Sequence, residues 1–177
     1  VTDSLPAIAI GLESPDKNIM NQKPRNSRKS IFADGLWSKI ILEGIMLGML
    51  TLVAFSVGNN LYGLEVGRTM AFVAMAMLEL VHSFNVKSEE SIFKVGILEN
   101  KYLIGAFILG TTLQVVVVMV PAFASVFSLV PLTGAQWLYT LGISILPVII
   151  IEAQKLLDSR LKAGRGVKVL EKRRITS

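Results

Sequence analysis

Two acidic residues, Asp3 and Glu79, lie inside apolar segments that could be embedded in a membrane. Asp3 lies in an apolar run, residues 1–12, and Pro6 follows it three positions later. Glu79 lies near the middle of a second apolar segment, residues 69–86. An ionisable side chain inside the hydrocarbon is costly and is typical of an ion or proton pathway. Because both side chains are carboxylates, they indicate a site for a hard cation or a proton.

Pro6 adds backbone oxygens to this hypothesis. Proline has no N–H, and in a helix interior its ring would press against the carbonyl of Thr2. A helix interrupted there would free carbonyl oxygens beside Asp3, and hard cations take such oxygens as ligands. The other interpretation of residues 1–12 is a short soluble strand or loop with a surface Asp3.

The Glu79 segment places further polar groups on the same side of a helix. His82 and Ser83 follow Glu79 at i+3 and i+4, so the three share one helix face. Glu79 could also be a neutral carboxyl that hydrogen-bonds to a neighbouring helix. Calcium takes about six to eight oxygens, usually with more than one carboxylate. Asp3 and Glu79 therefore need Thr2, carbonyls near Pro6 and groups outside this chain to complete a shell.

The composition indicates a membrane protein. Of the 177 residues, 52% are apolar and 18% are charged, against about 25% charged in soluble domains. As a helix, the first long apolar segment would measure about 28 Å, close to the hydrocarbon thickness. We therefore predict an all-α fold, a polytopic membrane helix bundle with four full transmembrane helices plus the cytoplasmic half of a fifth, residues 1–12. The four predicted spans are 40–58, 69–86, 102–120 and 136–151.

The connections between these segments differ in character. Residues 13–39 hold two prolines and many cations, as a solvated loop does. Residues 59–63 form a short connection, and residues 121–135 are expected to form a turn between spans. The last twenty or so residues, 155–177, are basic, and we expect them to be frayed.

Other polar residues in the spans are expected to be structural. Gln114 is neutral, and its amide favours an interhelical hydrogen bond. Three charged residues near span ends are expected to be interfacial, where long side chains reach water cheaply. These three are Glu43, Glu152 and Lys155.

The basic residues alternate between the connections. Residues 13–39 hold six Lys and Arg, residues 87–101 hold three and the tail from Lys155 holds eight, whereas the two other connections hold only Arg68. This alternation follows the positive-inside rule and puts the basic loops and the C-terminus in the cytoplasm. The net charge of +5 is then explained by the basic residues that set the orientation in the membrane, and no nucleic-acid partner is predicted.

Several classes of site are excluded by composition. The chain has no cysteine, which rules out disulfides and thiolate metal sites, and its one histidine rules out a His-rich cluster. No secretory signal pattern opens the chain. It begins with Val1 inside an apolar segment, which suggests a fragment.

The first 25 residues resemble one family closely. Thr2-Asp3-Ser4-Leu5-Pro6-Ala7, then Gly11 and the run from Pro15-Asp16 to Lys23-Pro24-Arg25, look like the sixth transmembrane helix and following loop of type II P-type cation-transporting ATPases. The likeness continues more loosely through Leu78-Glu79-Leu80, Asn100-Lys101, Gln136-Trp137 and Leu146-Pro147-Val148. It resembles most the sarco/endoplasmic-reticulum-type calcium pumps and their bacterial relatives, over essentially the whole chain.

The resemblance implies a division of the chain. Residues 1–12 would end transmembrane helix six and carry an ion-site motif, 13–39 would be a cytoplasmic coupling loop, 40–154 would form helices seven to ten, and 155–177 would be a basic cytoplasmic tail. The family's phosphorylation, nucleotide and actuator domains would lie outside this chain, together with their Mg²⁺ and ATP. This chain alone would therefore not hydrolyse ATP.

The resemblance also implies site roles. Thr2 and Asp3 match the motif whose oxygens bind the transported ion, and Glu79 matches the acid of helix eight. The transported Ca²⁺ would thus take Thr2, Asp3 and Glu79 as ligands. Ser4 departs from the family pattern, since animal calcium pumps usually have Gly there.

Alternatives remain open from the sequence. Pro24-Arg25-Asn26 echoes sodium/potassium pumps, so a fragment of a monovalent-cation pump is one alternative. A non-catalytic helical membrane subunit is another, whereas a secondary transporter would predict an internal repeat, which the sequence lacks. The predicted partners are membrane lipid, the remaining domains of the same ATPase and the transported cation. The predicted location is integral to a membrane, the plasma membrane if the source is bacterial.

Overall fold

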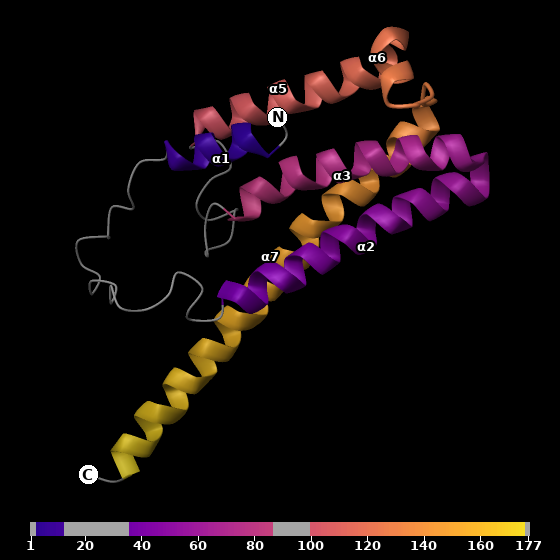
Figure 1. Ribbon diagram of the computed structural model, residues 1–177. Helices are drawn as coiled ribbons and strands as arrows, with labels where there is room; N and C mark the ends of the chain where they lie inside the picture. The colour runs from indigo at the N-terminus through magenta and orange to yellow at the C-terminus, as the bar shows by residue number, and fades with distance from the viewer. Residues whose placement is uncertain (1–2, 13–35, 87–99, 176–177) are drawn as a thin grey trace.

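The computed structural model describes residues 3–12, 36–86 and 100–175, with side chains of the last helix up to Leu157. Every regular element within these ranges is a helix, which confirms the all-α prediction for the described residues (Figure 1). The helices are α1 (Ser4–Gly11), α2 (Leu36–Tyr62), α3 (Leu64–Val86), α5 (Lys101–Met119), α6 (Pro121–Val126) and α7 (Gly134–Ile175).

Three of these helices are long and apolar enough to cross a membrane. They are α2, α5 and the part of α7 from Gly134 to Leu157. α3 covers the second predicted span, 69–86, but is not among them, and it is less apolar than α2 and α5. The described residues thus support a helical membrane bundle, while the count of four full spans stays a prediction.

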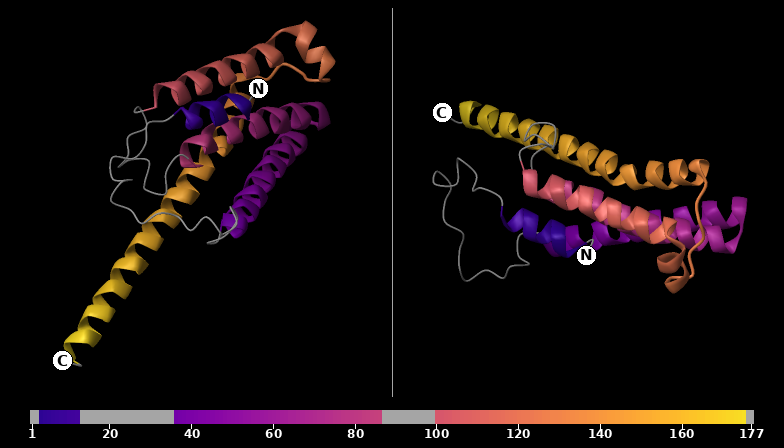
Figure 2. Two further views of the ribbon diagram at one scale, coloured as in Figure 1. Left: turned by 60° about the vertical axis from the view of Figure 1, so that its left-hand side comes forward. Right: turned by 90° about the horizontal axis from the view of Figure 1, so that it is seen from above.

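α3 is the helix around which the others assemble. It contacts α1, α2, α5 and α7, and the two views of Figure 2 show it lying among them. Its buried apolar side chains Met70, Val73, Met77 and Leu80 form the main core with Val118 and residues of the α6 region. α3 is therefore surrounded by protein, whereas long stretches of α2 and α5 expose apolar side chains.

α2 and α3 form a tight antiparallel hairpin. Only Gly63 separates them, at φ +96, a left-handed conformation that favours glycine. The backbones then pass close together, because a Cβ on Gly58 would lie 2.7 Å from the Gly67 Cα. Small residues at such a crossing let membrane helices approach, as they do here.

The helix bounds differ from the predicted spans. The expected connection at 59–63 is reduced to Gly63, because α2 continues to Tyr62. The expected turn at 121–135 contains α6, which starts at Pro121, where proline favours the first helical position. The tail was expected to be frayed, but α7 remains helical to Ile175, past the other helices in Figure 1.

The prediction of a helix interrupted at Pro6 involves the carbonyl of Thr2, which lies outside the described residues, so it stays a prediction. Within the described residues α1 runs from Ser4 to Gly11 and includes Pro6. The Ala7 N–H donates to the Asp3 carbonyl at 3.2 Å and closes its first turn. The described part of this segment is thus helical on the C-terminal side of Asp3.

The close contact at Gly67 gives a test of the hairpin. In Gly67→Ala the new Cβ would lie 2.8 Å from the Asn59 N and 2.9 Å from the Phe55 O. Since both are backbone atoms, the helices must separate, at a cost of about 1–3 kcal/mol. We expect a lower midpoint of thermal unfolding for the purified protein in detergent.

Gly105→Ala is the matched control, because a Cβ on Gly105 in α5 meets no atom within 4 Å. This control should unfold at the wild-type temperature or slightly above it. A Gly67→Ala protein as stable as the control would contradict the close α2–α3 approach.

A candidate cation site between α1 and α3

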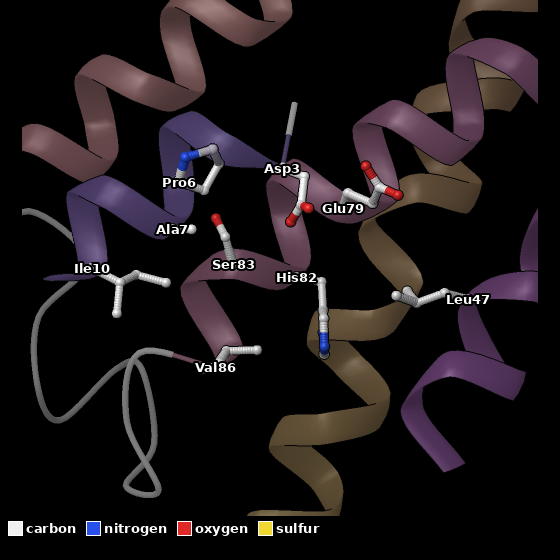
Figure 3. A pocket seen from close by; sticks show the side chains of 9 residues that line it. All are labelled: Asp3, Pro6, Ala7, Ile10, Leu47, Glu79, His82, Ser83 and Val86. Carbon is white, nitrogen blue, oxygen red and sulfur yellow. The ribbon is translucent and has the colours of Figure 1, made fainter. Parts of the chain in front are cut away.

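A pocket of about 250 Å³ lies where the start of α1 faces the second half of α3 (Figure 3). Its polar lining comes from Asp3 beside α1 and from Glu79, His82 and Ser83 of α3. The apolar lining completes the pocket and consists of Pro6, Ala7, Ile10, Leu47 and Val86.

The two helices present these groups for simple reasons of position. Asp3 directly precedes α1, and its side chain is exposed. On α3 the i, i+3, i+4 spacing puts Glu79, His82 and Ser83 on one face, as predicted. Ser83 is buried and donates its hydroxyl to the Leu80 carbonyl at 2.6 Å, so its oxygen stays beside the pocket as an acceptor.

Two of the three predicted cation ligands lie at the same pocket. Asp3 and Glu79, 76 positions apart in the sequence, line the same pocket, and Figure 3 shows both side chains among those that line it. Thr2 lies outside the described residues. Within the described ranges no group of three or more His, Asp or Glu side chains has the arrangement of a metal site. The pocket therefore offers two carboxylates and leaves the rest of a coordination shell to other groups.

A polar contact between two side chains joins α2 to α3 next to the pocket. The His82 Nε2 lies 3.4 Å from the Glu43 Oε2, with the two side chains 13% and 17% exposed. Lys39, one turn earlier on α2, lies 3.9 Å from the same carboxylate. His82 thus faces the pocket while its ring is held from the α2 side.

A second polar cluster lies between α3 and α7. The Lys155 Nζ donates to the Asn85 carbonyl at 3.3 Å and lies 3.4 Å from the Glu152 Oε1. Glu152 is only 6% exposed. Glu43, Glu152 and Lys155 were predicted to be interfacial, which stays a prediction, and all three contact α3 or lie buried beside it. The cause is tertiary: each of these residues lies on a helix, α2 or α7, that packs against α3.

The other polar prediction was correct. The Gln114 Nε2 in α5 donates to the Phe72 carbonyl in α3 at 3.5 Å, an interhelical hydrogen bond. The sequence analysis did not single out the contact between His82 and Glu43. This contact could have been found from the sequence. Glu43 lies near the start of one predicted span and His82 near the end of the next, and a short turn between antiparallel spans brings these two ends together.

The fold and the pocket together define a class of protein. The described chain is a helical integral membrane protein with an acidic pocket between its helices. A family model described as "Cation transporting ATPase, C-terminus" matches residues 1–157. The chain belongs to this family.

Individual relatives agree with the family match. The chain is 36% identical over 174 aligned positions to "Calcium-transporting ATPase 1" of Bacillus cereus, covering 88% of this chain and 20% of that protein. It is 33% identical to "Calcium-transporting ATPase" of Bacillus subtilis, covering 85% of this chain and 17% of that protein. A more distant relative, 28% identical over 86% of this chain, is "Calcium-transporting ATPase 3, endoplasmic reticulum-type" of Arabidopsis thaliana. The chain thus spans about a fifth of the length of the curated relatives it matches.

The Glu43–His82 contact generates a prediction about stability. Glu43→Ala and His82→Ala should each destabilise the protein, and their effects should not add, because one interaction is lost in either variant. We expect a coupling free energy of about 1 kcal/mol from the double-mutant cycle, measured by unfolding in detergent.

The control cycle pairs His82→Ala with Ser56→Ala, since the Ser56 hydroxyl on α2 is exposed and bonds only to the Leu52 carbonyl of its own helix. That cycle should be additive within about 0.5 kcal/mol. Equal coupling in the two cycles would show that the pair makes no specific contribution.

Proposed function

We propose that this chain is the C-terminal membrane part of an ATP-driven calcium pump, in which Thr2, Asp3 and Glu79 supply oxygen ligands to the transported Ca²⁺. The observation that carries the proposal is the common pocket of Asp3 and Glu79. Two carboxylates from different helices suit a divalent cation, because each contributes charge and oxygen. At membrane depth neither is expected to serve packing alone.

The names of the relatives favour calcium as the cargo. The Bacillus cereus, Bacillus subtilis and Arabidopsis thaliana proteins are all described as calcium-transporting. A monovalent-cation pump is the less favoured alternative, since these relatives do not support it. Membership of the ATPase family likewise disfavours a separate helical subunit.

The ligand set extends beyond the described pocket. Thr2 precedes Asp3 directly, so its hydroxyl or carbonyl could reach the same cation. Ser83 adds a hydroxyl oxygen to the pocket lining. Since calcium takes about six to eight oxygens, the remaining ligands would come from helices outside this chain.

The positions of the basic residues support a topology for the pump. In this arrangement α1 is the cytoplasmic half of helix six, α2, α3, α5 and α7 provide helices seven to ten, and residues 13–39 form a cytoplasmic coupling loop. Residues 87–101 and the C-terminus lie on the same side, as the positive-inside rule requires. Lipid surrounds the exposed apolar faces of α2 and α5. Domains outside this chain bind ATP and Mg²⁺ and carry out phosphorylation.

The first test removes the charge of Asp3. In the full-length pump, Asp3→Asn should abolish calcium-dependent formation of the phosphorylated enzyme from ATP, because the cation loses a charged ligand. Chelation of calcium should abolish it in the wild type as well. The control is Glu65→Gln, which neutralises an exposed acid in the first turn of α3. Normal calcium activation of the Asp3→Asn pump would overturn the assignment.

The second test concerns Glu79. Glu79→Gln keeps the size of the side chain and removes its charge, so the fold should survive while calcium binding weakens. We expect the calcium concentration for half-maximal phosphorylation to rise about tenfold, equivalent to about 1.4 kcal/mol. An unchanged calcium titration would make Glu79 a structural residue.

A further inference from the structure

Asn100 makes two hydrogen bonds that point to different helices. Its Oδ1 accepts from the Leu103 N–H at 2.9 Å and so caps the start of α5. Its Nδ2 donates to the Ala9 carbonyl at 3.0 Å, near the end of α1. The side chain is 4% exposed, so neither bond competes freely with water. One buried amide thus joins two helices whose residues are 91 positions apart.

Apolar contacts also hold α1 against its neighbour. Its packing is mainly against α5, through a small cluster in which Ala9 meets Leu103 and Ala106. The hydrogen bond from Asn100 lies at the edge of this cluster and fixes how far α1 can slide along α5.

The other end of α1 carries the candidate ligand. Asp3 directly precedes the helix and faces the pocket that Glu79 lines. α1 makes fewer contacts with α3 than with α5. The place of Asp3 relative to Glu79 is therefore set in large part by how α1 is held on α5.

We propose that Asn100 is a positioning residue for the cation site, holding α1 on α5 so that Asp3 stays opposite Glu79. The role in cation binding rests on the proposed function, whereas the role in holding α1 does not. Asn100 touches neither the pocket nor a ligand, and it acts through α1.

The chemistry of the residue separates this role from simple capping. Ser and Asp cap helices about as well as Asn, because each offers a side-chain oxygen to a backbone N–H. Neither can also donate an amide N–H to the Ala9 carbonyl in the way that Asn does. Asn100→Ser and Asn100→Asp therefore keep the α5 cap and remove the link to α1, whereas Asn100→Ala removes both.

The experiment uses the full-length pump and two measurements. The first is amide hydrogen exchange over residues 4–12 and over the start of α5. The second is the free-calcium concentration for half-maximal phosphorylation from ATP. Gln114→Leu is the matched control, since it breaks another hydrogen bond from an α5 side chain to a backbone carbonyl, that of Phe72, away from α1.

We expect Asn100→Ser and Asn100→Asp to speed exchange in α1 and leave the first turn of α5 protected. We expect the half-maximal calcium concentration to rise about two- to tenfold, as the loss of one hydrogen bond allows, with the maximal level of phosphorylated enzyme unchanged. Gln114→Leu should change neither α1 exchange nor the calcium titration.

Wild-type exchange in α1 of both variants would overturn the proposal, whatever the transported ion. Faster α1 exchange with an unchanged calcium titration would overturn the link from Asn100 to the cation site. A wild-type pump without calcium-dependent phosphorylation would refute the proposed function alone, and the exchange data would still decide whether Asn100 holds α1.

Discussion

The structure depends on the cost of placing polar side chains inside an apolar helix bundle. α3 carries Glu79, His82 and Asn85 through the centre of the described residues, where water cannot serve as a ready partner. Neighbouring helices contact α3 through polar groups of their own. Glu43 of α2 meets the His82 side chain, and Lys155 of α7 donates to the backbone carbonyl of Asn85. Polar contacts thus join α3 to the helices on both sides of it.

The same constraint explains why α3 is the least membrane-like of the long helices by composition. A helix surface that faces lipid must be apolar, whereas a surface that faces protein can hold polar groups. α2 exposes a long series of apolar side chains, whereas most of those of α3 are buried or half-buried. The acidic pocket lies against α3, which contacts α1, α2, α5 and α7.

Much of this fold could be predicted from the sequence, since apolar length and charge position are local properties. The helical class, the common face of Glu79, His82 and Ser83 and the role of Gln114 followed from spacing alone. The helix ends did not, because the single residue Gly63 is enough to reverse the chain between α2 and α3. The partners of Glu43 and Asn100 depend on which helices become neighbours, and no local pattern states that. Nothing in the described residues tests the cation ligands themselves.

The one-residue reversal at Gly63 also limits how this region can move. α2 and α3 are joined by one residue and approach backbone to backbone at Gly58 and Gly67, so we expect them to move together. α1 and α5 form a second pair through Ala9, Leu103 and Asn100. Asp3 belongs to the second pair and Glu79 to the first. A small rotation of one pair against the other would change the separation of the two carboxylates while leaving the contacts within each pair intact.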